Sequence, residues 1–209
     1  MAVVGILPAA GSGERLGASG PKAFALCGGR PLLDWSLDVL ESVCDRVVVA
    51  VPAGYDEGVD RVVGGASRSA SVRAALAAAP EATVAVVHDA ARPLVSDELV
   101  ERVVTPLSQG WDGAVPGLAV VDTVKRVGPD GAIVETVPRG ELVAVQTPQA
   151  FVADVLRRAL ASESASAATD CASLVEAQGG RVQVVDGDPR LLKVTSPEDL
   201  ALVESWLAA

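Results

Sequence analysis

The sequence predicts an α/β protein with an open, doubly wound, mostly parallel sheet and one projecting β-arm. Short apolar runs alternate with longer helix-like patterns along most of the 209 residues, which is typical of strands joined by covering helices. The apolar runs are rich in β-branched residues and nearly unbroken, as expected for strands buried on both faces. One segment follows a different, alternating pattern and predicts the arm. In sheets of this kind, ligands bind beyond the carboxyl ends of the strands.

The first half of the chain supplies three strands and two helices. The run MAVVGIL at residues 1–7 is apolar throughout and predicts a buried strand. The helix expected at 31–43 opens with a proline, which the first helical turn tolerates. Valine-rich runs at 46–52 and 83–89 predict two further strands, and the alanine-rich segment 68–79 predicts a helix between them.

The second half continues the alternation. Ser96 and Ser196 each precede a helical pattern and are expected to be N-caps, with Pro197 at the first position of the last helix. The remaining elements are strands at 112–120 and 181–187 and helices at 96–107, 150–162, 169–178 and 196–207.

Residues 120–142 break this rhythm. Two short alternating runs flank GPDG, which is a hairpin signal and not a strand–helix unit. A hairpin that projects from an α/β core would expose Val and Ile unless a partner covers them. We therefore expect a homodimer that is built partly by this arm, at about 119–142, on a single domain spanning 1–209. A hairpin folded back on its own domain is the alternative.

Composition limits the partners and the compartment. The formal net charge is −10, so a nucleic-acid partner is not expected, because such binding needs a positive surface. An anionic substrate would require the few basic residues to be gathered at one site. The sequence shows neither an apolar run of the ~20 residues needed to span a membrane nor a signal peptide. Three scattered cysteines form no CxxC pair, so we expect a cytoplasmic protein.

The stretch LPAAGSGERLGASGPKAF, residues 7–24, follows the first strand. It fails the dinucleotide fingerprint because, after Gly11 and Gly13, the third glycine comes one position late, at Gly17. It also fails the patterns of the P-loop and the nucleophile elbow. What remains is a glycine-rich turn whose N–H groups can cradle phosphate oxygens, with Arg15 and Lys22 to supply charge. The alternative is a surface loop with two solvated cations.

Eight motifs along the chain then resemble one family. They are L-P-A-A-G-S-G-E-R-L-G followed by P-K, GGASRSASV (64–72), VHDAARP (87–93), DTVKR (122–126), VPRGEL (137–142), QTPQAF (146–151), TDCASL (169–174) and KVTSPEDL (193–200). Together they are similar to the 2-C-methyl-D-erythritol 4-phosphate cytidylyltransferase family of sugar and alcohol nucleotidyltransferases. The resemblance implies a Rossmann-like fold of the nucleotide-diphospho-sugar transferase type.

The activity that this resemblance implies belongs to non-mevalonate isoprenoid biosynthesis. A cytidylyl group passes from CTP to 2-C-methyl-D-erythritol 4-phosphate, giving 4-diphosphocytidyl-2-C-methyl-D-erythritol and pyrophosphate, with Mg²⁺ or another divalent cation. Such a transfer needs alignment and charge neutralisation and no protein nucleophile. The lone His88 is accordingly expected to be a packing or hydrogen-bonding residue.

Site residues follow from the same resemblance. The catalytic set is Arg15 on the departing phosphates, Lys22 on the α-phosphate and Lys193 on the acceptor; Asp89 is the implied Mg²⁺ ligand. The CTP-binding set is Ala9, Ala10, Gly11, Gly13, Arg15, Lys22, Gly65, Ser71 and Asp89. The acceptor-binding set is Asp89, Arg92, Thr123, Arg139, Thr147, Thr169 and Lys193, in which Thr123 and Arg139 lie on the arm and reach the neighbouring subunit's site.

The sequence departs from the family pattern at two places, and three other functions are considered. Cys171 stands where the family is usually acidic, and Leu191 and Leu192 stand where a polar residue is often found. A ribitol-5-phosphate cytidylyltransferase shares most of these motifs, and a non-catalytic nucleotide sensor could share the fold. A dinucleotide-dependent oxidoreductase is disfavoured by the broken fingerprint.

Overall fold

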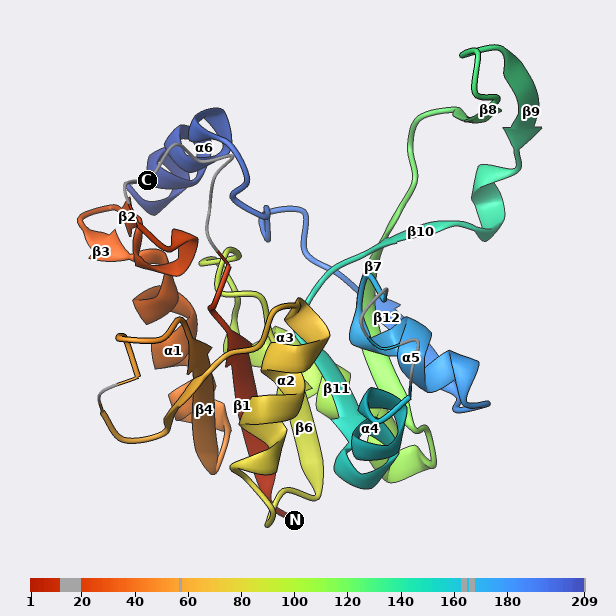
Figure 1. Ribbon diagram of the computed structural model, residues 1–209. Coiled ribbons are helices and arrows are strands. Elements are labelled where there is room, and N and C mark those ends of the chain that lie inside the picture. Colours follow the sequence, from red (N-terminus) through yellow and green to blue (C-terminus); the bar gives the residue numbers. More distant parts are fainter. Residues whose placement is uncertain (12–19, 57, 163–164, 166–167, 209) are drawn as a thin grey trace.

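The computed structural model describes the chain except for residues 12–19, 57, 163–164, 166–167 and 209. Its core is an eight-stranded sheet with the order β10–β7–β11–β6–β1–β4–β5 and with β12 beside β7 (Figure 1). The strands are β1 (Val3–Pro8), β4 (Arg46–Val51), β5 (Arg61–Val63), β6 (Val84–Val87), β7 (Gly113–Ala119), β10 (Val143–Val145), β11 (Gln149–Val152) and β12 (Val182–Asp186).

The centre of the sheet is parallel. β1 lies between β4 and β6, so that Ile6 is paired with Val48 on one side and Val87 on the other. β5 extends this parallel set beyond β4, and β12 runs parallel to β7. The five predicted strands correspond to β1, β4, β6, β7 and β12, and the expectation of a mostly parallel sheet is confirmed.

The helix expected at 150–162 is wrong at its first three residues. Ala150 and Phe151 belong to β11, which runs antiparallel between β6 and β7 and pairs with both. Phe151 is fully buried, and its ring lies so close to Gly113 that a Cβ there would be 2.5 Å from it. Pairing on both edges outweighs any local helical preference, so the helix begins at Ala153.

Helices cover both faces of the sheet. One buried cluster packs α2, α4 and α5 on one face, and a second packs α1 and α3 on the other. The helices are α1 (Leu32–Val43), α2 (Arg68–Ala77), α3 (Asp97–Val104), α4 (Ala153–Leu160), α5 (Cys171–Ala177) and α6 (Pro197–Leu207). Ser96 and Ser196 are N-caps as predicted, and Ser196 forms a capping box with Asp199. The predicted helix 96–107 changes at Thr105 into the 3₁₀ helix η3 (Thr105–Gln109).

A small satellite unit stands above the carboxyl ends of the central strands, where α6 packs on the hairpin of β2 (Leu26–Cys27) and β3 (Arg30–Pro31) (Figure 1). Its buried residues are Cys27, Leu32, Val194 and Val203. The short 3₁₀ helix η2 (Lys22–Phe24) leads into this hairpin, and the stretch 191–195, which is neither helix nor strand, leads into α6. The unit thereby carries two of the predicted catalytic lysines to the same end of the sheet.

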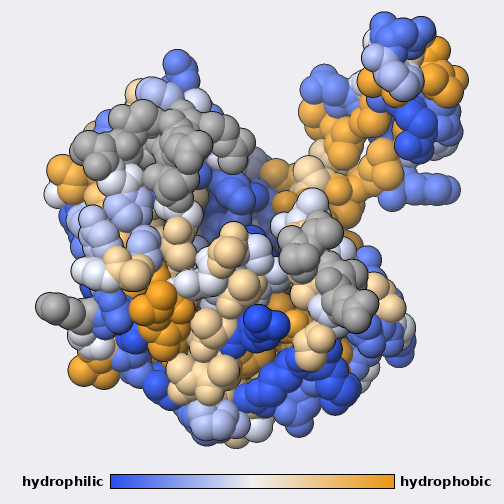
Figure 2. All heavy atoms as spheres, viewed as in Figure 1, coloured by the Kyte–Doolittle hydropathy of each residue, from blue (hydrophilic) through white to orange (hydrophobic). Residues whose placement is uncertain are grey.

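The arm is a separate two-stranded sheet of β8 (Val124–Val127) and β9 (Ile133–Val137). Figure 1 shows that it stands away from the core, and Figure 2 shows apolar side chains on its surface. Ile133 and Val134 are 65% and 67% exposed. The predicted hairpin is confirmed, and the alternative in which it folds back on its own domain is wrong.

Candidate active site

A cleft of about 600 Å³ opens at the carboxyl ends of β1 and β6, beneath the satellite unit. Its walls come from the start of the glycine-rich loop, from the first turn of α2, from the segment after β6 and from the stretch before α6. It brings together many of the predicted residues, namely Ala9, Ala10, Gly11, Lys22, Gly65, Ser71, Asp89 and Lys193. The cleft therefore lies beyond the carboxyl ends of the strands, where ligands bind in sheets of this kind.

Asp89 is the centre of charge in this cleft. Among the described residues that line the cleft it is the only carboxylate, and it is 8% exposed. Its Oδ1 accepts a hydrogen bond from Arg68 Nε at 2.9 Å, and its Oδ2 accepts one from Lys193 Nζ at 2.6 Å. Burial alone would raise the pKa of Asp89, but the charges of Arg68 and Lys193 outweigh it and hold that pKa well below its usual value.

A buried chain of hydrogen bonds fixes the backbone at Asp89. The Asp89 N–H donates to Thr147 Oγ1 at 3.0 Å, and Thr147 Oγ1 lies 3.1 Å from His88 Nδ1. His88 Nε2 lies 3.1 Å from the carbonyl of Arg92, which can only accept. These partners assign the proton to Nε2, so Nδ1 accepts from Thr147. His88 is fully buried and structural, as predicted, and Thr147 supports the site from behind.

The loop before α2 lets two segments of backbone approach each other closely. A Cβ on Gly64 would lie 2.5 Å from Cβ of Ala10, and one on Gly65 would lie 2.4 Å from Cβ of Ala70. Ser71 is buried and closes the loop, because its Oγ accepts from the Gly65 N–H at 3.1 Å and lies 3.0 Å from the carbonyl of Ser67. The two glycines are thus required by close packing.

Other predicted residues lie outside the walls of this cleft. Arg92 is not among the lining residues and donates from Nη1 to the carbonyl of Leu191 at 2.7 Å. Thr169 stands before α5, next to the N-cap Asp170. Thr123 and Arg139 are at the base of the arm, where Arg139 donates to the carbonyl of Val121. Two predicted residues, Gly13 and Arg15, lie outside the described residues.

Sequence reasoning missed Arg68 as a site residue. It lies inside the motif GGASRSASV, at the first position of α2, and its side chain reaches Asp89. The available signal was a cation in the first turn of a helix, where the helix dipole disfavours positive charge. Of the residues that depart from the family pattern, Cys171 and Leu191 are buried and Leu192 is partly buried. Cys171 Sγ lies 3.4 Å from Arg68 Nη1, and Leu191 is part of the core. Burial raises the pKa of the Cys171 thiol.

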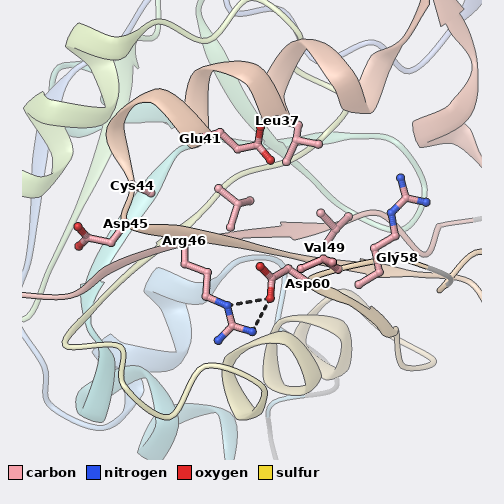
Figure 3. Close-up of a pocket in the computed structure, with 11 residues that line it drawn as sticks. Leu37, Glu41, Cys44, Asp45, Arg46, Val49, Gly58 and Asp60 are labelled. Carbon is pink, nitrogen blue, oxygen red and sulfur yellow. Dashed lines mark hydrogen bonds and ion pairs between the residues drawn. The ribbon is translucent and has the colours of Figure 1, made fainter.

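A second cavity, of about 550 Å³, lies at the far edge of the sheet between α1 and the strands β4 and β5 (Figure 3). Leu37 and Glu41 of α1 face it from one side. Arg46 is satisfied there by two hydrogen bonds to Asp60 and one to Glu81. None of the predicted site residues that the structure describes lines this cavity, so the cleft around Asp89 is the candidate active site.

Comparisons with known proteins identify the family of this chain. A family model described as 2-C-methyl-D-erythritol 4-phosphate cytidylyltransferase matches residues 3–209. Relatives of that name from Nocardia farcinica and Rhodococcus opacus are 48% and 46% identical, over 98% and 97% of this chain and 94% of each relative. A crystal structure of the enzyme of that name from Thermus thermophilus is similar with a TM-score of 0.85, at 40% identity over the full length of both chains.

The fold, the cation-lined cleft and these matches define a nucleotidyltransferase. More narrowly, the chain belongs to the 2-C-methyl-D-erythritol 4-phosphate cytidylyltransferase family. Enzymes of this family transfer a cytidylyl group from CTP to 2-C-methyl-D-erythritol 4-phosphate in isoprenoid biosynthesis. Among the helices that the structure describes, none has the length and apolar character to cross a membrane.

His88 generates a prediction about pH. Burial lowers the pKa of His88 from 6.5 to about 4, so between these values the unfolded chain binds more protons than the folded one. The free energy of unfolding is therefore at its full value above pH 6.5 and falls as the pH drops toward 4. We expect a loss of about 1–2 kcal/mol between pH 7 and pH 5, measured by urea unfolding.

The chain has a single histidine, which makes the control simple. His88→Gln removes the only side chain that ordinarily titrates in this window and should show a much flatter pH dependence. Equal pH dependence in the two proteins would contradict the assignment.

Proposed function

We propose that the cleft around Asp89 is where the cytidylyl transfer takes place, with Arg15, Lys22 and Lys193 as its catalytic residues. The observation that carries this is the convergence of Lys22, Lys193 and Arg68 on one cleft in a chain whose net charge is −10. A site for two phosphorylated substrates needs such a concentration of positive charge. Membership of the family supports the same reaction.

CTP is proposed to lie along the glycine-rich loop and the loop before α2. The backbone at Ala9, Ala10 and Gly65, with Ser71 closing the loop, would read the edge of the cytosine. Backbone N–H groups of Gly11 and Gly13 would meet the phosphates. The Lys22 N–H donates to the Gly11 carbonyl at 3.2 Å, which brings Lys22 to the beginning of this loop. Lys22 then neutralises the α-phosphate, and Arg15 neutralises the departing pyrophosphate.

The donor set of the cleft fits a Mg²⁺ ion that arrives with the nucleotide. Among the described residues, no group of three or more His, Cys, Asp or Glu side chains could hold a metal ion. Mg²⁺ is often bound by one or two carboxylates together with substrate phosphates, and Asp89 supplies one carboxylate that faces the cleft. When bound, Mg²⁺ would neutralise part of the negative charge of the phosphates.

The acceptor phosphate is proposed to bind beside Asp89, at Lys193, Arg92 and Thr169, while Thr147 orients Asp89. Lys193 is more mobile than Arg92, because an ammonium on a flexible four-carbon stem can bind an anion from many directions. Its side chain is 42% exposed. It can therefore leave Asp89 for the acceptor phosphate and hold the attacking hydroxyl in line with the α-phosphorus.

A homodimer is proposed to complete the site. The arm exposes Val127, Ile133 and Val134, which a second copy of the chain would cover. Thr123 and Arg139, at the base of the same arm, would then reach the acceptor site of the partner. The three cysteines are free thiols, which supports a reducing, cytoplasmic setting.

Lys22→Ala is expected to lower the rate of pyrophosphate release by about 10²–10³-fold, because a preorganised donor to the developing charge is lost. The circular dichroism and the unfolding midpoint should stay those of the wild type. Arg158→Ala, which removes an exposed cation on α4, is the matched control and should leave the rate unchanged. A Lys22→Ala enzyme with near-normal turnover would refute the role of this lysine.

Val134→Asp tests the arm. A charge at this exposed apolar position should break the dimer, seen by light scattering, and lower the rate about 10²-fold because contacts to the reacting groups are lost. Val59→Asp is the control, since Val59 is 91% exposed and lies far from the arm, at the opposite sheet edge. A fully active monomer would exclude a shared site.

The acceptor is tested directly by pyrophosphate release with CTP and Mg²⁺. We expect release with 2-C-methyl-D-erythritol 4-phosphate and none with D-ribitol 5-phosphate. Release with ribitol phosphate alone would keep the chemistry and overturn the acceptor. Binding of CTP without release in either case would instead indicate a nucleotide sensor.

A further inference from the structure

Arg68 occupies a position that is unfavourable for its own helix. It is the first residue of α2, directly after the N-cap Ser67, whose hydroxyl accepts from the Ala70 N–H at 3.1 Å. The first turn of α2 contains no acidic residue. A cation there meets the positive end of the helix dipole. A residue that breaks a local rule in this way is expected to be compensated elsewhere, and such sites are often functional.

The compensation comes from two distant segments. Arg68 Nε donates to Asp89 Oδ1 at 2.9 Å, after the end of β6, and Arg68 Nη1 donates to Cys171 Sγ at 3.4 Å, at the start of α5. Arg68 Nη2 is buried and has no hydrogen-bond partner among the described residues. The guanidinium is thus held in one orientation by contacts that join three elements of the fold.

The two cations on Asp89 differ in how firmly they are held. The side chain of Arg68 is 24% exposed and has a second partner in Cys171, whereas that of Lys193 is 42% exposed. A planar guanidinium is preorganised for its hydrogen bonds, and an ammonium is a mobile point charge. Arg68 is accordingly the fixed partner of Asp89, and Lys193 is the exchangeable one.

We propose that Arg68 is a positioning residue that holds Oδ1 of Asp89, so that the carboxylate presents only Oδ2 to the divalent metal that arrives with CTP. This inference rests on the proposed function. With Oδ1 occupied by Arg68, Asp89 is a ligand through one oxygen. The rest of the coordination must then come from phosphates and water, which makes metal binding depend on the nucleotide.

A direct role is the competing explanation, because Arg68 also lines the cleft and a guanidinium is a good partner for a phosphate. The two roles predict different affinities for CTP when no metal is present. A direct contact would make CTP binding depend on Arg68 even in the presence of a chelator. In a positioning role, the variant binds CTP as well as the wild type does when no metal is present. Only its affinity for the metal is lower.

The test uses the full-length wild-type chain, Arg68→Gln, Arg68→Lys and the control Arg73→Gln. Arg73 is an exposed cation on the same helix. Free and bound Mn²⁺ are measured by electron paramagnetic resonance with saturating CTP and no acceptor, and CTP binding is measured by calorimetry with a chelator. Arg68→Gln should raise the Kd of Mn²⁺ about 10–100-fold, the range for losing an outer partner of a metal ligand. Arg68→Lys should raise it less, and Arg73→Gln not at all.

A second readout is the dependence of the rate on Mg²⁺. If Arg68 acts through metal affinity, high Mg²⁺ should restore most of the kcat of Arg68→Gln, which a merely structural defect would not allow. Unchanged Mn²⁺ affinity in a folded Arg68→Gln protein would overturn the proposal. If that variant does not fold, wild-type Mn²⁺ affinity in Arg68→Lys would overturn it. Lost CTP binding in the chelator would also overturn it, in favour of a direct contact.

Mn²⁺ binding by the wild type shows whether the proposed function fails or only the positioning role of Arg68. If the wild type itself binds no Mn²⁺ in the presence of CTP, the proposed metal role fails and the positioning role fails with it. If the wild type binds Mn²⁺ and the Arg68 variants bind it equally well, only the positioning role is refuted.

Discussion

The pairing of one buried carboxylate with two cations is the interaction on which the site depends. Asp89 is 8% exposed, and a buried charge is costly unless it is paired and hydrogen-bonded. Arg68 and Lys193 each take one of its oxygens. The pairing also works in the other direction, because Asp89 holds two cations at one end of an acidic protein; in the proposed function Lys193 alone exchanges Asp89 for an anionic substrate, and Arg68 stays.

The fold supplies the parts from four distant segments. Asp89 follows the end of β6, and a hydrogen-bonded chain through Thr147 and His88 fixes its backbone N–H. The first turn of α2 delivers Arg68. The satellite unit of β2, β3 and α6 delivers Lys22 and Lys193 through a small cluster that includes Cys27 and Val194. Packing of the elements around these residues is what the proposed function requires, because charge that develops in a reaction is stabilised best by groups that are already in place.

Much of this could be predicted from the sequence, and the exceptions share a cause. The parallel strands, the caps at Ser96 and Ser196 and the hairpin follow from local patterns. Residues 150–152 do not, because their strand is made by pairing with β6 and β7. Arg68 was missed for the same reason: its role comes from a contact with Asp89, 21 residues away, and nothing in the local pattern records such contacts. The hydrogen bonds of the Thr147 hydroxyl to the Asp89 N–H and to His88 are likewise contacts that the local pattern does not record, and its predicted contact with the acceptor stays a prediction.

The most direct measurement of the account is a crystal structure of the wild-type enzyme with Mg²⁺ and a non-hydrolysable CTP analogue. We expect that Arg68 Nε remains on Asp89 Oδ1, that Lys193 has left Oδ2, and that the metal has taken its place. A complex in which Lys193 stays on Asp89 and the metal binds elsewhere would contradict the exchange of partners at Asp89.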